Sequence, residues 1–424
     1  EALAWTRVSP ADAVAVAAFT TQSIADESVR VAADIATRTS RWSGPPTCAE
    51  APAYRVCDRT FGAFDYRGAD GVVAGAEPVA SYDLEVRAWM PSDASGPRPV
   101  VLFGHGIGVN REQAVIVADQ LARAGIITVA IDAPAHGVHP TATPGSSELE
   151  QLTRFFGIDL RNQRLDALAL RDNLRQATYD KLQLLRLLGA DLDLDGDGAA
   201  DIDPERLAYL GASLGGIMGP ELLSLSPDLS AGFLTVPGGR VASIIAEGPA
   251  FSVLVRAMTP AGTPPGDVAR LFPLIQTLIE RGDPANYGPH VLHDRLPGAG
   301  AAPPHLLVNM AIGDSIIPNA STRALARALG VPHVPPVLQD LGGVPLAPAA
   351  PVSRNLADGR TTAGLFQFDR GVRDAEQGVE AADHDVAITV EGILQMNRYF
   401  QAWAATGTPE IIDPYDVLGT PPLP

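Results

Sequence analysis

Two patterns of hydrophobic and polar residues alternate along the chain from residue 81 onward. Tyr82–Met90 alternates polar and apolar residues as a strand does, and the strands that follow are short, continuous apolar runs typical of a buried parallel sheet. Those runs are Pro99–Phe103, Ile126–Ile131, Leu207–Leu210, Ser243–Ala246, Leu306–Ala311 and Leu365–Phe368, and helical spacing of apolar residues covers Gln113–Ala124, Leu168–Leu188 and Val386–Ala405. Strands that alternate with helices predict an α/β fold, with a mostly parallel sheet covered by helices on both faces.

The first 80 residues follow a different pattern. Ala11–Thr37 is rich in Ala and Val with helical spacing in its second half, and Arg38–Asp65 carries the Pro, Gly and Cys residues of an irregular segment. We therefore expect residues 1–80 to form an N-terminal extension, packed on a main body of residues 81–424. Because the chain starts at Glu1 without an initiator methionine or a signal peptide, we expect a processed or trimmed form.

Two long connections interrupt the alternation of strands and helices. Pro140–Asn173 follows the strand Ile126–Ile131, and Gly248–Pro304 separates two later predicted strands. Connections this long usually act as lids or binding loops, and packing of their apolar residues in the core is the alternative.

Composition excludes several classes of protein. With 46% hydrophobic and 19% charged residues, the chain is globular and not disordered as a whole. The formal net charge of −18 argues against nucleic acids and anionic membranes as partners. The longest uncharged run, Leu296–Gly313, is interrupted by prolines, so we predict no transmembrane helix.

The chain has two cysteines, Cys48 and Cys57, which lie nine residues apart. A close pair without further Cys or matching His ligands does not make a zinc site. We favour a disulfide in an exported protein over two free thiols, and this predicts an oxidising compartment.

The clearest chemical signal is Gly211-Ala212-Ser213-Leu214-Gly215, a G-x-S-x-G motif. The motif follows a short apolar strand and opens a helical segment, which is the context of a nucleophile elbow. Its small glycines permit the sharp turn that lifts the serine hydroxyl above the sheet. We predict Ser213 as the nucleophile, and a glycine-rich turn without a catalytic role is the alternative.

A second glycine-rich loop, Gly104–Gly108, follows the strand Pro99–Phe103. In acyl-transfer enzymes the loop at this place supplies one backbone N–H to the oxyanion, and the residue after the nucleophile supplies the other. We assign these donors to Ile107 and Leu214. We expect His105 to brace the loop, and a tight turn without a catalytic role is again the alternative.

The acid of a catalytic triad should follow a later strand of the sheet. Asp314 lies just past the buried strand Leu306–Ala311. Asp340 lacks such a strand, and Asp369 follows the last strand, where the base is expected next. We therefore predict Asp314 as the acid.

The base should lie between the final strand and the last helix. His384 occupies that position, whereas its main rival, His333, comes too early in the chain. Ser213, Asp314 and His384 thus follow the Ser…Asp…His order of α/β-hydrolases.

From about Ser81 to its end, the chain resembles an α/β-hydrolase of the secreted bacterial lipase and esterase kind. More narrowly, Phe19–Ser23, the pair Cys48 and Cys57, and an Asp-rich run before the elbow resemble exported lipases of the bacterial virulence-factor lipase group. Members of that group often carry a larger N-terminal β domain and a lipoprotein anchor, neither of which we expect in this chain. The resemblance implies acyl-lipid substrates.

The Asp-rich run Asp191–Asp203 places six carboxylates in thirteen positions just before the strand that leads to the elbow. Hard oxygen ligands at alternate positions, with a glycine at the sharp turn, are typical of a calcium loop. The predicted ligands are Asp193, Asp195, Asp197, the Ala199 carbonyl, Asp201 and Asp203. Pro204 stands where such loops carry their bidentate Glu. A solvated acidic turn is the alternative, and a bound ion would be structural.

The function that we predict is a serine carboxylic-ester hydrolase that acts on apolar acyl esters through an acyl-enzyme, without a cofactor for catalysis. Peptide or amide hydrolysis on the same triad is one alternative. A catalytically inactive, calcium-dependent surface adhesion module is another. We expect a small-molecule or lipid ester as substrate, association with lipid aggregates, and a secreted, cell-surface or periplasmic location in a bacterium.

Overall fold

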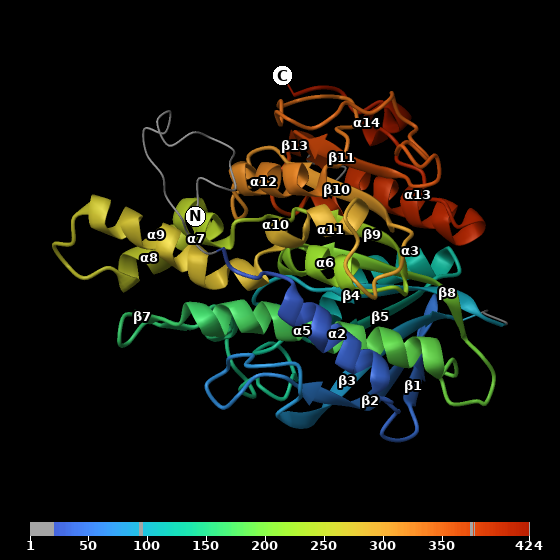
Figure 1. Ribbon diagram of the computed structural model, residues 1–424. Helices are drawn as coiled ribbons and strands as arrows, with labels where there is room; N and C mark the ends of the chain where they lie inside the picture. The colour runs from blue at the N-terminus through green and yellow to red at the C-terminus, as the bar shows by residue number, and fades with distance from the viewer. Residues whose placement is uncertain (1–20, 93–95, 374–375, 377, 424) are drawn as a thin grey trace, which may run out of the picture.

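The computed structural model describes residues 21–92, 96–373, 376 and 378–423 (Figure 1). Its central sheet has nine strands in the order β1-β2-β3-β5-β4-β8-β9-β10-β11. These are β1 (Thr47–Glu50), β2 (Tyr54–Asp65), β3 (Ala80–Pro91), β4 (Arg98–Gly104), β5 (Ile127–Ile131), β8 (Ile202–Ala212), β9 (Leu229–Thr235), β10 (His305–Ala311) and β11 (Ala363–Phe368). β3 pairs antiparallel with β2 and β5, and the strands from β5 to β11 pair in parallel. This is the α/β-hydrolase fold, and it confirms the predicted class.

Helices cover both faces of the sheet, as the continuous apolar strands require. Val101 and Leu102 of β4, for example, point to opposite faces and are both fully buried. One face is covered by α2 (Asp26–Thr37), α5 (Ala167–Ala190), α6 (Leu214–Leu225), α10 (Pro284–Tyr287), α11 (Pro289–Leu292) and α12 (Asn319–Leu329). The other is covered by α3 (Val115–Arg123), α13 (Val390–Thr406) and α14 (Pro414–Leu418).

The expected N-terminal extension is in fact continuous with the main sheet. β2 pairs with β3 along its whole length, from Tyr54 opposite Pro91 to Asp65 opposite Ala80. The segment predicted to be irregular therefore contains two strands, and the second of them, β2, pairs with a strand of the expected main body. As predicted, a disulfide joins Cys48 of β1 to Cys57 of β2. α2 begins at Asp26, in the second half of the predicted helical segment, and residues 11–20 lie outside the described part of the chain.

One predicted strand is wrong. Ser243–Ala246 lies inside α7 (Val241–Glu247), and the strand between β8 and β10 in the sheet is β9 (Leu229–Thr235) instead. A short apolar run does not distinguish a buried strand from a buried helix. β9 contains Ser, Ala and Gly, which are poor strand formers, and the packing of Leu223 and Leu306 against Gly232 explains the small residue there.

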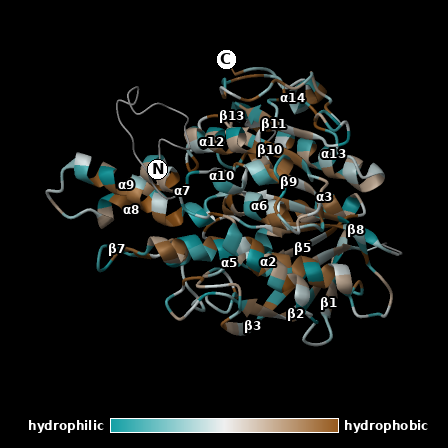
Figure 2. Ribbon diagram, in the orientation of Figure 1, coloured by the Kyte–Doolittle hydropathy of each residue, from teal (hydrophilic) through white to brown (hydrophobic). Residues whose placement is uncertain are grey.

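The two long connections carry additional elements beside the carboxyl edge of the sheet. The first contains α4 (Glu148–Phe155), which begins with a capping box, and a hairpin of β6 (Ile158–Asp159) and β7 (Arg164–Leu165). The second contains α8 (Ser252–Met258) and α9 (Pro265–Ile279). We call α7, α8, α9 and the β6–β7 hairpin the cap. α8 and α9 project from the body at the left of Figure 1, and Figure 2 shows hydrophobic residues along both helices.

A third buried apolar cluster joins the cap to the start of α6. It includes Leu214 and Ile217 of α6, Ile245 of the cap and Phe156 of the first connection. Residues of the two insertions therefore pack directly against the end of the sheet where the predicted nucleophile lies. Among the described helices no single one is long and apolar enough to span a membrane. α7 and the segment Pro249–Met258, which is bent by 69° relative to it, reach that length and apolar composition only when taken together.

Candidate active site

Ser213 lies at a sharp turn between the end of β8 and the start of α6. Its backbone has φ +53° and ψ −111°, a conformation that residues other than glycine rarely adopt. A Cβ atom at Gly211 would overlap the carbonyl oxygen of Gly215, and one at Gly215 would overlap that of Gly104. Both positions therefore require glycine, because the backbone of another residue passes too close to leave room for a side chain. This tight turn is the geometry of a nucleophile elbow.

The three residues predicted as a triad lie in one hydrogen-bonded chain. His384 Nε2 is 2.8 Å from Ser213 Oγ, and His384 Nδ1 is 2.9 Å and 3.0 Å from the two carboxylate oxygens of Asp314. Asp314 is buried, and its Oδ1 also accepts the backbone N–H groups of Ile316 at 2.9 Å and Ile317 at 2.8 Å. The fixed carboxylate selects the tautomer with a proton on Nδ1, which leaves Nε2 free to accept the serine proton.

Asp383, which we did not single out from the sequence, links the two loops that carry the predicted acid and the predicted base. Its Oδ1 accepts the N–H of Ser315 and of His384, each at 2.7 Å, and its Oδ2 accepts the Ser315 hydroxyl at 3.0 Å. Although partial burial opposes ionisation, the hydrogen bonds from Ser315 and His384 hold the pKa of Asp383 below its ordinary value. The only signal in the sequence is an aspartate directly before the predicted base.

We expect Asp383→Ala to lower kcat about tenfold, because it removes three hydrogen bonds that position His384 against Asp314. Steady-state ester hydrolysis tests this, with Asp385→Ala as a neighbouring control whose carboxylate pairs with Arg373. Equal rates for Asp383→Ala and wild type would show that the loops keep their places without the link.

Two backbone N–H groups beside Ser213 are available to an oxyanion. Within the described residues, neither the N–H of Ile107 nor that of Leu214 donates a hydrogen bond. Leu214 is the first residue of α6, where the helix leaves its N–H groups free and favours negative charge. A Cβ atom on Gly106 would lie 3.6 Å from Ser213 Cβ, so the loop that carries Ile107 lies beside the nucleophile. Both predicted donors are therefore next to Ser213.

The other candidates for acid and base lie elsewhere. His333 lies beside β11, Asp340 accepts a backbone N–H in its own turn, and Asp369 pairs with the neighbouring arginine. None of the three is hydrogen-bonded to Ser213 or His384 in the part of the chain that the structure describes.

The predicted calcium ligands are only partly brought together. Carboxylate oxygens of Asp193, Asp195 and Asp197 lie within 4.8 Å of one another. Asp201 instead accepts backbone N–H groups of its own loop, and Asp203 pairs with an arginine 3.5 Å away. The guanidinium of Arg55 pairs with Asp195 and neutralises part of the charge of the cluster. The Ala199 N–H donates to Asp197 at 2.7 Å.

No protein-family model and no curated protein sequence matches this chain. Solved structures that are similar to it include the acetyl xylan esterase from Paenibacillus sp. R4, at 15% identity over 74% of this chain and 87% of that chain, with a TM-score of 0.49. Another is acetyl xylan esterase 1 from Thermoanaerobacterium sp. JW/SL YS485, at 15% identity over 71% and 81% of the two chains, with a TM-score of 0.46. A third is a cold-adapted esterase from an Arctic intertidal metagenomic library, at 14% identity, 84% and 98% coverage and a TM-score of 0.39.

Proposed function

We propose that this protein is a serine carboxylic-ester hydrolase that works through an acyl-enzyme. The observation that carries the proposal is the hydrogen-bonded chain from Ser213 through His384 to Asp314, beside two free backbone N–H groups. In this mechanism His384 takes the Ser213 proton as Oγ attacks the ester carbonyl, and the N–H groups of Ile107 and Leu214 receive the oxyanion. The proton then passes from His384 to the leaving alcohol. Water, activated by the same imidazole, hydrolyses the acyl-enzyme.

An apolar acyl group is the substrate feature that the cap supports best. A cavity of about 260 Å³ lies within the cap, and most of its lining side chains are apolar. Cap residues that line it, such as Ile245, Leu254 and Phe272, belong to the same apolar cluster as Ile107 and Leu214. A substrate bound at Ser213 could therefore extend an apolar chain toward the cavity. The narrower resemblance to virulence-factor lipases, and acyl-lipid substrates with it, are part of this proposal.

The test combines a fluorophosphonate probe with p-nitrophenyl esters from acetate to palmitate. We expect the probe to label Ser213, as read by peptide mass spectrometry, and we expect the wild-type protein to hydrolyse esters in the series. Failure of both would overturn the proposal and would favour a non-catalytic module. The chain length with the highest kcat/KM would define the acyl group.

We further propose that Ca²⁺ binds the loop of Asp193, Asp195 and Asp197 and stabilises the fold without taking part in the reaction. The three clustered carboxylates support this, because a cation converts their repulsion into coordination. An ion that binds only the folded loop adds about 2.7 kcal/mol of stability at 100 times its dissociation constant.

We therefore expect EDTA to lower the melting temperature and added Ca²⁺ to restore it, with turnover unchanged well below melting. Asp195→Ala should be insensitive to both reagents, whereas Asp119→Ala, which alters an exposed ion pair with Arg123, should respond like wild type. If neither EDTA nor Ca²⁺ changes the melting temperature, the loop is a solvated acidic turn that Arg55 stabilises in part.

We also propose that the protein is located in an oxidising compartment outside the bacterial cytoplasm. The Cys48–Cys57 disulfide is compatible with that location. Binding to the surface of lipid aggregates is also proposed. Leu271 and Leu274 of α9, which are 54% and 63% exposed, offer apolar area for it.

A further inference from the structure

Two buried histidines bind the oxyanion loop, residues 104–108, to the turn at residues 133–136. The first, His105, belongs to the oxyanion loop. Its Nε2 accepts the N–H of Ala133 at 2.9 Å, and its Nδ1 lies 2.7 Å from the carbonyl oxygen of Gly106. Since Nε2 must be an acceptor, Nδ1 carries the proton and donates to that carbonyl.

The second histidine, His136, makes the reciprocal contact from the turn. Its Nε2 accepts the N–H of Gly108 at 3.2 Å, and its Nδ1 donates to the carbonyl oxygen of Pro134 at 2.9 Å. The ring centres of His105 and His136 are 5.1 Å apart, and both side chains are fully buried. Each loop thus supplies one imidazole that accepts a backbone N–H of the other loop.

These contacts hold the peptide groups on both sides of Ile107. On one side of Ile107, the Gly106 N–H donates to Gln113 Oε1 at 2.8 Å. On the other side, the Gly108 N–H is held by His136. The Ile107 peptide is therefore fixed at both ends, and its own N–H, which donates no hydrogen bond within the described residues, is one of the two available beside Ser213.

We propose that His136 is a positioning residue for ester hydrolysis, which fixes Gly108 and thereby directs the Ile107 N–H at the oxyanion that forms on Ser213. This inference rests on the proposed function. An oxyanion hole acts through donors that are already in place when charge develops, so a donor that moves by a fraction of its hydrogen-bond length loses most of its effect.

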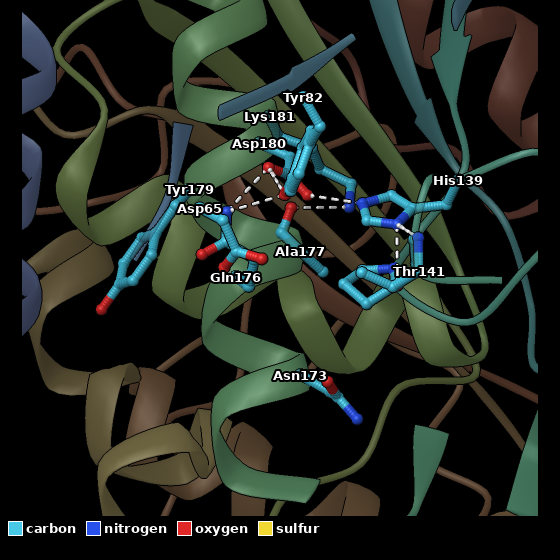
Figure 3. Close-up of polar contacts among 12 residues, drawn as sticks. Asp65, Tyr82, His139, Thr141, Asn173, Gln176, Ala177, Tyr179, Asp180 and Lys181 are labelled. Carbon is cyan, nitrogen blue, oxygen red and sulfur yellow. Dashed lines mark hydrogen bonds and ion pairs between the residues drawn. The ribbon is translucent and has the colours of Figure 1, made fainter. Parts of the chain in front are cut away.

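The turn that carries His136 is itself held on both sides. Before it, the Asp132 carboxylate accepts the N–H of Arg111 at 2.6 Å and of Val138 at 2.9 Å. After it, His139 Nε2 lies 3.2 Å from Asp180 of α5, and Figure 3 shows the imidazole directed at that carboxylate. His136 thus lies on a turn whose flanking residues are hydrogen-bonded to α5 and to the segment before α3.

His136 can do this only as a neutral imidazole, because a protonated ring has no acceptor for the Gly108 N–H. Burial lowers the pKa of His136 to about 4 and that of His105 to about 3. The charged and titratable groups that face His136 are Asp132 and His139, which flank its turn, His105 of the oxyanion loop and Lys181 of α5. Both histidines therefore remain neutral at the pH of an ordinary esterase assay.

The test replaces the acceptor while it keeps the ring. We expect His136→Phe to lower kcat about 100-fold with KM within threefold of wild type, which is the loss expected when one oxyanion donor is removed. Affinity for a trifluoromethyl ketone should fall by a similar factor. This probe adds to Ser213 Oγ, the serine proton passes to His384, and the carbonyl oxygen becomes the oxyanion. His136→Gln, which keeps an acceptor, should recover most of the activity.

His333→Gln is the matched control, since His333 is buried and its pKa is also lowered by burial, but it lies beside β11. It should leave kcat and the affinity for the ketone unchanged. If the Phe side chain is not accommodated, His136→Leu removes the acceptor in a smaller volume and should give the same loss. If His136→Phe or His136→Leu is folded and keeps kcat within threefold of wild type, the inference about His136 is overturned and the proposed function is not. Wild-type protein without ester turnover or fluorophosphonate labelling would overturn the proposed function as well.

Discussion

Replacing Ser213 with alanine is expected to lower kcat for ester hydrolysis by about a million-fold, to the rate left by binding and by the oxyanion donors. The variant keeps the Cβ atom and loses Oγ, the atom that lies 2.8 Å from His384 Nε2. Alanine meets the same backbone strain as serine at φ +53°, so we expect the melting temperature to stay within a few degrees of the wild-type value.

Measurement of kcat with a p-nitrophenyl ester, together with thermal melting, checks this result. Ser224→Ala is the matched control, because Ser224 lies on the same helix and its hydroxyl donates to the Glu221 carbonyl within that helix. Its turnover should equal that of wild type. Ester hydrolysis that persists in Ser213→Ala at the wild-type rate would assign the activity to another group.

Asp314→Asn is expected to lower kcat by about 10⁴-fold while the protein stays folded. The Asn carbonyl oxygen can still accept the N–H groups of Ile316 and Ile317, which now bind Oδ1 at 2.9 Å and 2.8 Å. The amide NH₂ then faces His384 Nδ1 and donates to it. This selects the tautomer with the proton on Nε2, and that imidazole cannot accept the proton of Ser213.

Steady-state kinetics with a melting curve for each variant tests this prediction. Asp340→Asn and Asp369→Asn are the controls, because both residues follow Asp314 in the chain and neither is bonded to His384 in the described structure. Both controls should keep the wild-type kcat. A large loss in either control, with Asp314→Asn fully active, would move the acid of the triad to that residue.

Much of the fold and of the triad could be predicted because the signals are local. A nucleophile elbow needs a strand, small residues on both sides of a serine and a helix, all within about a dozen positions, and the chain around Ser213 has them. Asp314 follows β10 and His384 comes after β11, and these two parallel strands end at the same edge of the sheet. The order of strands along the chain was therefore enough to predict Asp314 and His384 as the acid and the base of one site.

The errors of prediction occur where local signals are weak and distant partners decide. Arg38–Asp65 has the composition of an irregular segment, yet β2 forms because β3 offers it twelve partner residues. Ser243–Ala246 has the apolar run of a strand, yet α7 buries it in the cluster beside the cap. Pairing and burial that depend on other parts of the chain outweigh intrinsic propensity in both cases.

By itself the sequence determined the class of fold, the disulfide, and the candidate nucleophile, acid and base, because each rests on residue types at short spacing or on chain order. Only the tertiary structure decided which groups hold that chemistry in place. Asp383 links two loops that are 68 residues apart in the chain, and His136 reaches a glycine 28 residues away. A hydrogen bond depends on distance and direction in space, and folding, unlike spacing along the chain, sets both.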